Sequence, residues 1–374
     1  MGGQSTTPYR FRALDGWRGI AAPLIAFFHF HINSAISTSV FVRHSWMLVD
    51  FFFVLSGFVV THAYAGRLET AESRVTFWKK RFARVWPLHV TMLGLFILLE
   101  LYRYATTGVG FTGDRSVFAI FTNLTLLQSM HFHDQLTWNT PSWAVSTEFY
   151  TYIVFALLLG AATGAGKRIF AGIFIVVGSL GVLIFVSRYG MHETFDFGFF
   201  RCLYGFFFGS LAYETWRRWP VRSGTIVEAA ALVLTVIYLL YASGHAVLEY
   251  LSAPVFAMIV LAFAGDGGAI SRVLCTEPIL KLGQWSYAIY LVQMFIITLI
   301  FSALDTAHLG VTRIGSDGSE MVVLDNALLS NAVTLIYLAV VIAVGALAWR
   351  FIEIPGHSLF GGAKTATASQ PAAG

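Results

Sequence analysis

The chain has 374 residues, of which 57% are hydrophobic and only 12% are charged, and its mean hydropathy is +0.70. An average soluble domain carries about 25% charged residues. These values exclude a water-soluble enzyme and a disordered chain, and the net charge of +4 is spread too thinly for a nucleic-acid groove. The composition favours an all-α integral membrane protein, with the lipid bilayer as its partner.

Ten segments are apolar and long enough to predict transmembrane helices, because a span needs roughly 20 apolar residues. They are 19–38, 46–65, 84–104, 142–160, 169–187, 197–215, 225–242, 247–265, 284–304 and 328–350. The seventh and eighth lie close together, so a re-entrant pair is an alternative there. Segment 116–130 is short and contains Asn123, and it predicts an interfacial helix, with a true span as the alternative.

The Lys and Arg residues predict the orientation. Most of the 24 fall in loops on the same side as the N-terminus. This favours both termini in the cytoplasm and one domain, 1–360, in the cytoplasmic membrane. Residues 1–12 are polar and unlike a cleavable signal, and the Ala- and Gly-rich tail 361–374 is expected to be disordered. Cys202 and Cys275 fall on opposite sides, so we expect them not to pair.

Charged residues in the first span are candidates for function, because ionisable groups inside a membrane are expensive. Arg18 and His29 are eleven residues apart, which puts both on one helix face about 16 Å apart. Asp15, one turn before Arg18, is expected to pair with it and is a candidate substrate-binding residue. His29 is expected near mid-membrane as a general base. The alternative is a histidine that bonds a carbonyl for packing.

A basic cluster stands where the third span begins. Lys80, Arg81 and Arg84 lie there, and the last two are one turn apart. Both guanidinium groups could therefore bind one phosphate of a polyanionic cytosolic ligand. Positive charge that serves only topology and lipid headgroups is the alternative.

The fourth span carries a carboxylate, Glu148, about two turns from its outer end. It could orient His29, stabilise its charge or bind an acceptor hydroxyl, or it could simply be a buried Glu bonded to neighbouring Trp, Ser or Tyr groups. Candidate substrate-binding residues beside it are Trp143, Ser146 and Tyr152.

Other polar or small residues in the spans have simpler explanations. Ser56 and Gly57 let helices approach closely, and Asp50 is explained as a helix N-cap. Arg201 at the outer membrane edge is a candidate substrate-binding residue, with a side chain that reaches lipid headgroups as the alternative. Glu353 is expected to stabilise the end of the last helix.

Six motifs in order over roughly residues 10–356 resemble the acyltransferase type 3 family of multi-pass membrane O-acyltransferases. They are LDGWRGIAAPLIAFFH (14–29), DFFFVLSGF (50–58), RxxR (81–84), PSWAVSTEFYTY (141–152), LGQWSYAIYLVQ (282–293) and FIEIP (351–355). The resemblance implies transfer of an acyl group, usually acetyl, from cytosolic acyl-CoA to a hydroxyl of an envelope or exported glycan. It also implies that His29 and Arg18 are essential, and that basic residues near 81–84 bind CoA.

The match has departures. Position 293 is Gln where the family often has His, so Gln293 is assigned no proton transfer. Thr147 and Glu148 replace two adjacent acids. No soluble esterase-like domain follows the last span, so we expect the membrane domain and its loops to select the acceptor.

The expected mechanism uses acyl-CoA as co-substrate and no metal. His29 would deprotonate the acceptor, and Glu148 would steady the resulting imidazolium. A transporter or flippase is the rival interpretation, with His29, Arg18 and Glu148 as a proton relay. A membrane scaffold or sensor is a third.

Overall fold

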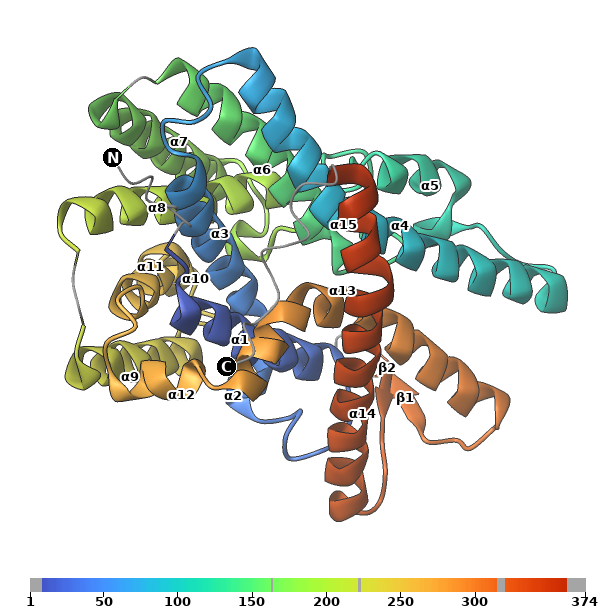
Figure 1. Ribbon diagram of the computed structural model, residues 1–374. Coiled ribbons are helices and arrows are strands. Elements are labelled where there is room, and N and C mark those ends of the chain that lie inside the picture. Colours follow the sequence, from blue (N-terminus) through green and yellow to red (C-terminus); the bar gives the residue numbers. More distant parts are fainter. Residues whose placement is uncertain (1–8, 163, 221–222, 315–319, 362–374) are drawn as a thin grey trace.

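The computed structural model describes residues 9–162, 164–220, 223–314 and 320–361 (Figure 1). The described part is mainly helical, as the composition predicts, and its strands form one antiparallel hairpin of β1 (Thr312–Ile314) and β2 (Glu320–Val322). The tail expected to be disordered lies, from residue 362 onward, outside the described residues.

A helix overlaps each of the apolar segments, although several bounds differ from the predicted ones. The helices are α1 (Arg12–His29), α2 (Val40–Arg43), α3 (Leu48–Tyr64), α4 (Ala71–Thr107), α5 (Val117–Leu124), α6 (Ser142–Ala161), α7 (Ala165–Phe185), α8 (Gly198–Arg218), α9 (Thr225–Tyr241), α10 (Ala246–Glu249), α11 (Ser252–Phe263), α12 (Ala269–Leu274), α13 (Glu277–Thr306), α14 (Ala327–Ala348) and α15 (Ile354–Gly361). A π-helical turn, Trp349–Glu353, joins α14 to α15, so the two run on as one long helical segment (Figure 1).

Within the described residues, seven helical stretches are long and apolar enough to cross a membrane. They are Val40–Tyr64, Ala71–Thr107, Ser142–Ala161, Ala165–Phe185, Ala246–Phe263, Glu277–Thr306 and Ala327–Phe360. All ten predicted segments overlap helices, but α1, α8 and α9 are not among the seven stretches. Helix α9, for example, is too short, because it has 17 residues. A multi-pass helical membrane protein is therefore supported, while ten spans and two cytoplasmic termini remain predictions. Cys202 and Cys275 are both free, as expected.

The first predicted span has the wrong bounds. Helix α1 begins seven residues earlier than predicted and ends at His29, because Phe30 adopts an extended backbone (φ −91°, ψ 96°). Asn33 then donates from its side chain to the carbonyl of Leu324 at 2.9 Å. His29 is consequently the last residue of its helix, and not a residue in the middle of a span.

The predicted interfacial segment 116–130 contains only the eight-residue helix α5. Eight helical residues rise about 12 Å, which is too short to cross a bilayer. The structure therefore disfavours the alternative of an additional span.

Glycines allow the central helices to touch at their backbones. A Cβ atom at Gly57 of α3 would overlap the carbonyl of Phe206 on α8, and one at Gly209 would overlap the carbonyl of Val54. Gly283 of α13 lies equally close to the carbonyl of Asp15 on α1. Small residues commonly permit this packing in membranes. The packing confirms the expected role of Gly57, and it holds α3 against α8 and α1 against α13.

Candidate active site

A cavity of ≈ 160 Å³ lies among the central helices, and five of them contribute its walls. The lining residues are Leu14, Asp15 and Arg18 of α1; Val49, Phe52, Phe53, Leu55, Ser56, Val59 and Val60 of α3; Arg81, Arg84 and Val85 of α4; Ala144, Val145, Glu148 and Tyr152 of α6; and Ser286, Tyr287 and Tyr290 of α13. Charged groups that are far apart in the sequence therefore meet in one space, as the sequence analysis expected for most of them.

Arg18 is half-buried and projects into this cavity. The carboxylate of Asp15 accepts a hydrogen bond from Nε of Arg10 at 2.7 Å, and no ion pair within 4.0 Å joins it to Arg18 in the described part of the chain. The expected pairing of Asp15 with Arg18 is therefore wrong. At longer range Asp15 still attracts the Arg18 guanidinium, and so do Glu148 and Glu353.

Arg84 has a partner that the sequence analysis did not predict. Its guanidinium lies 3.5 Å from the carboxylate of Glu353 in the π-helical turn, whose side chain is buried. The second oxygen of Glu353, Oε2, is buried without a hydrogen-bond partner among the described residues. Glu353 thus belongs to the charged cluster, in addition to any effect on its own helix end.

Arg81 sits inside an aromatic cage. Its guanidinium carbon lies 5.3 Å from the ring centre of Tyr64, 5.5 Å from Phe77 and 5.4 Å from Tyr152. Such cation–π contacts hold the positive charge without neutralising it, and among the described residues the Nε of Arg81 is buried and unpartnered. Lys80, its neighbour, does not line the cavity.

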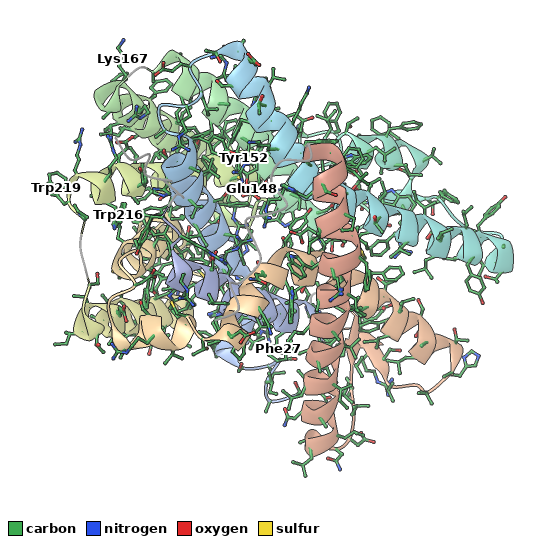
Figure 2. All side chains as sticks on the ribbon, viewed as in Figure 1. Phe27, Glu148, Tyr152, Lys167, Trp216 and Trp219 are labelled. Carbon is green, nitrogen blue, oxygen red and sulfur yellow. The ribbon has the colours of Figure 1, made fainter. Side chains whose placement is uncertain are left out.

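Glu148 is held by Tyr152, one turn later on α6. The Tyr152 hydroxyl donates to Oε1 of Glu148 at 2.7 Å and lies 3.0 Å from the hydroxyl of Ser56 on α3. The two labelled side chains lie next to each other in Figure 2. Because the ring of Tyr152 also contacts Arg81, this tyrosine connects the carboxylate to the caged cation.

His29 stands apart from this cluster. Its Nδ1–H donates to the carbonyl of Ile25 at 2.9 Å; since a carbonyl only accepts, the proton is on Nδ1 and Nε2 is the free acceptor. In the described chain the lining of the cavity on α1 ends at Arg18, about 16 Å along the helix from His29. Phe27, near the same helix end, is well separated from Glu148 in Figure 2.

Three predicted substrate-binding residues are engaged in packing. The hydroxyl of Ser146 donates to the Leu126 carbonyl at 2.5 Å. Arg201 is 2% exposed and forms two hydrogen bonds to the carboxylate of Asp50, at 2.7 and 3.0 Å. Trp143 is buried and stacks against the Arg201 guanidinium at 5.2 Å.

These contacts correct two explanations. Arg201 does not reach toward headgroups, and Asp50 is the partner of a buried cation, not a simple N-cap. The reason is distance in sequence: 151 positions separate the two residues, so neither segment alone reveals the pair.

The sequence analysis missed Tyr287 and Tyr290, which line the cavity from α13. The Tyr287 hydroxyl donates to the Val85 carbonyl at 2.5 Å, which joins α13 to α4. Both tyrosines lie in the motif LGQWSYAIYLVQ, so their place in this motif was the one feature of the sequence that could have indicated a role in the site. Across the described residues, no group of three or more His, Cys, Asp or Glu side chains could hold a metal ion.

Apolar helices around a buried cavity that gathers three arginines and two carboxylates define a multi-pass membrane protein with an internal polar site. A family model described as an acyltransferase domain matches residues 11–350. The chain therefore belongs to the acyltransferase type 3 family, and it is an enzyme that transfers acyl groups.

Individual relatives agree with this assignment. The chain is 28% identical over 355 residues to acyltransferase MdmB of Streptomyces mycarofaciens, covering 87% of this chain and 84% of the relative. It is 24% identical over 376 residues to peptidoglycan O-acetyltransferase OatA of Listeria monocytogenes, covering 92% of this chain and 55% of the relative. Protein 2 in the picA locus of Rhizobium radiobacter is 34% identical over 169 residues, 40% of this chain and 82% of that protein. No solved structure matches the chain.

Proposed function

We propose that the chain transfers a short acyl group, most simply acetyl, from cytosolic acyl-CoA to a hydroxyl of a glycan outside the cytoplasm. The observation that carries this proposal is the convergence of Arg18, Arg81, Arg84 and Glu148 on one cavity with apolar walls. Such a cavity suits a donor that is a polyanion at one end and an apolar thioester at the other.

The arginines are the donor's phosphate ligands in this proposal. The cage of Arg81 retains a full positive charge and an unpartnered buried Nε–H, and Arg84 lies one turn further along α4. Arginine suits phosphate because its planar fork can donate two parallel hydrogen bonds. Lys80, on the same helix but outside the cavity lining, would add attraction at the mouth.

His29 is the proposed general base. Its Nε2 takes the proton of the acceptor hydroxyl, the oxygen forms a bond to the thioester carbonyl carbon, and the carbon–sulfur bond breaks. The leaving CoA thiolate then takes the proton back from the imidazolium, so the histidine is regenerated. The hydrogen bond from Nδ1 to Ile25 supports this role, because it fixes the ring and leaves Nε2 free.

The separation of His29 from the cavity gives the two ends of the enzyme different tasks. The donor binds with its phosphates among the charged residues and its acyl group in the cavity, and the flexible pantetheine arm then carries the thioester toward His29 at the end of α1 for transfer. Glu148 is bonded to Tyr152, so its proposed role moves from steadying the imidazolium to positioning Arg18 and the donor.

The acceptor is proposed from the relative's name and the topology. OatA is named for acetyl transfer to peptidoglycan, and a glycan hydroxyl would approach His29 from the side of the membrane where α1 ends. The corresponding partner here is a hydroxyl-bearing glycan of the envelope, and Asp15 would assist on the donor side because it lines the cavity.

The test is to give membrane vesicles that contain the full chain acetyl-CoA labelled in the acetyl group. Label appearing on glycan at the opposite face supports the proposal. Proton-coupled movement of a solute with no transfer of label would contradict it and favour a carrier.

A further inference from the structure

The cavity has distinct levels along the helices. Ser56 of α3 and Tyr152 of α6 share a level, because their hydroxyls are 3.0 Å apart. Arg81 belongs to the same level, since its guanidinium carbon lies 5.4 Å from the Tyr152 ring. One turn further on, about 5.4 Å higher, come Glu148 on α6 and Phe52 and Phe53 on α3.

The second level is also charged. Arg84 precedes Val85, whose carbonyl accepts the hydrogen bond from Tyr287 at 2.5 Å. This bond fixes α13 at the same height as α4. The charged groups that line the cavity from α4 and α6 are thus confined to two adjacent levels.

The third level differs from the two below it. One turn beyond Phe52 and Glu148, the lining consists of Val49 on α3, Ala144 and Val145 on α6, and Tyr290 on α13. All four are at most 9% exposed. None of these four residues carries a charge, and we name them the apolar collar.

The apolar collar stands between the charged levels and His29. Helices α1 and α3 run antiparallel, because Phe11 contacts Phe58 (ring centres 5.1 Å apart) while Trp17 contacts Phe51 (6.4 Å). The direction from Arg18 toward His29 is therefore the direction from Phe52 toward Val49. A thioester extending from the charged levels toward His29 reaches the collar on its way.

Resting on the proposed function, we propose that the apolar collar contacts the acyl group of the donor and sets its length. The collar is the uncharged part of the lining that lies in the direction of His29, as an acyl chain requires, and the whole cavity measures only ≈ 160 Å³. Ala144 is its smallest member, so the room beside Ala144 and Val145 determines how many carbons fit. The inferred donor class is a short-chain acyl thioester.

The test compares the same substitution at two levels. Val145→Ala enlarges the collar. Val60→Ala is the matched control, because it removes the same atoms from another buried lining residue. Val60 lies on α3 on the opposite side of the charged levels from the collar. Displacement of tritiated acetyl-CoA from the purified full chain by unlabelled butyryl-CoA and acetyl-CoA gives an affinity ratio. This ratio does not depend on how much protein is folded.

One methylene in an apolar pocket changes discrimination by roughly 10- to 200-fold. We expect Val145→Ala to raise the butyryl-to-acetyl affinity ratio about tenfold, Ala144→Val to lower it, and Val60→Ala to leave it unchanged. If the affinity ratio shifted equally in Val145→Ala and Val60→Ala, or in neither, this inference would be overturned and the proposed function would stand. A wild-type chain that binds no acyl-CoA would overturn the proposed function and the inference together.

Discussion

The ring of His29 is oriented for proton transfer by a single local contact. Its Nδ1–H is committed to the Ile25 carbonyl, so Nε2 is the nitrogen that can accept a proton. Neither Arg18 nor Glu148 has to contact the ring for this to hold. The chemistry of the residue is therefore set within one turn of its own helix.

Replacing His29 by Ala tests this role. General-base assistance is typically worth about 10²- to 10⁴-fold in rate, so we expect His29→Ala to lower acyl transfer by that range. Binding of tritiated acetyl-CoA should change little, because His29 does not line the described cavity. Wild-type turnover in this variant would remove His29 from the mechanism.

The caged cation Arg81 has a different expected phenotype. Hydrogen bonds to charged groups contribute about 1.5–3 kcal/mol, so Arg81→Gln should weaken acetyl-CoA binding roughly 10- to 100-fold. Lys79→Gln is the matched control, since Lys79 is exposed and outside the cavity lining. Equal losses in the two variants would indicate a general effect of surface charge and not a specific phosphate ligand.

At the scale of elements, α3 and α8 are joined by backbone contacts and by one buried ion pair. The glycines at Gly57 and Gly209 permit the contact, and Asp50 and Arg201 hold another part of the same interface. The other face of α3 forms a wall of the cavity. Support for the cavity thus comes from helices that do not line it.

Breaking this ion pair should destabilise the fold. Removal of one partner of a buried pair costs about 3–5 kcal/mol because the other charge stays buried. We expect Asp50→Asn to lower the midpoint of thermal unfolding in detergent clearly, and the exposed-residue variant Asp305→Asn to leave it unchanged. An unchanged midpoint in Asp50→Asn would show that the pair is dispensable.

The sequence predicted elements better than partners. Apolar runs located the helices, because hydropathy over about 20 residues is a local property. The end of α1 was misplaced because Asn33 bonds to Leu324, and the partner of Arg84 was missed because Glu353 is 269 positions away. Contacts of this kind depend on the tertiary fold, which a single sequence does not display.

At the scale of the whole molecule, the account requires a cytosolic mouth and an outward-facing base. The positive-inside rule predicts that the N-terminus and the loop that precedes Lys80 lie on the cytoplasmic side. A cysteine introduced at Glu72, which is exposed near the start of α4, should react with an impermeant thiol reagent only after the cells are opened. Reaction in intact cells would reverse the topology and contradict entry of cytosolic acyl-CoA at this face.

The most direct measurement is photo-crosslinking with a CoA thioester whose short acyl chain carries a diazirine, followed by mass spectrometry of the full chain. We expect crosslinks at the apolar collar, on peptides that contain Val49, Ala144 or Tyr290, and we expect excess acetyl-CoA to suppress them. Crosslinks confined to helices that do not line the cavity, such as α7, and insensitive to acetyl-CoA, would contradict the claim that the donor's acyl group enters this cavity.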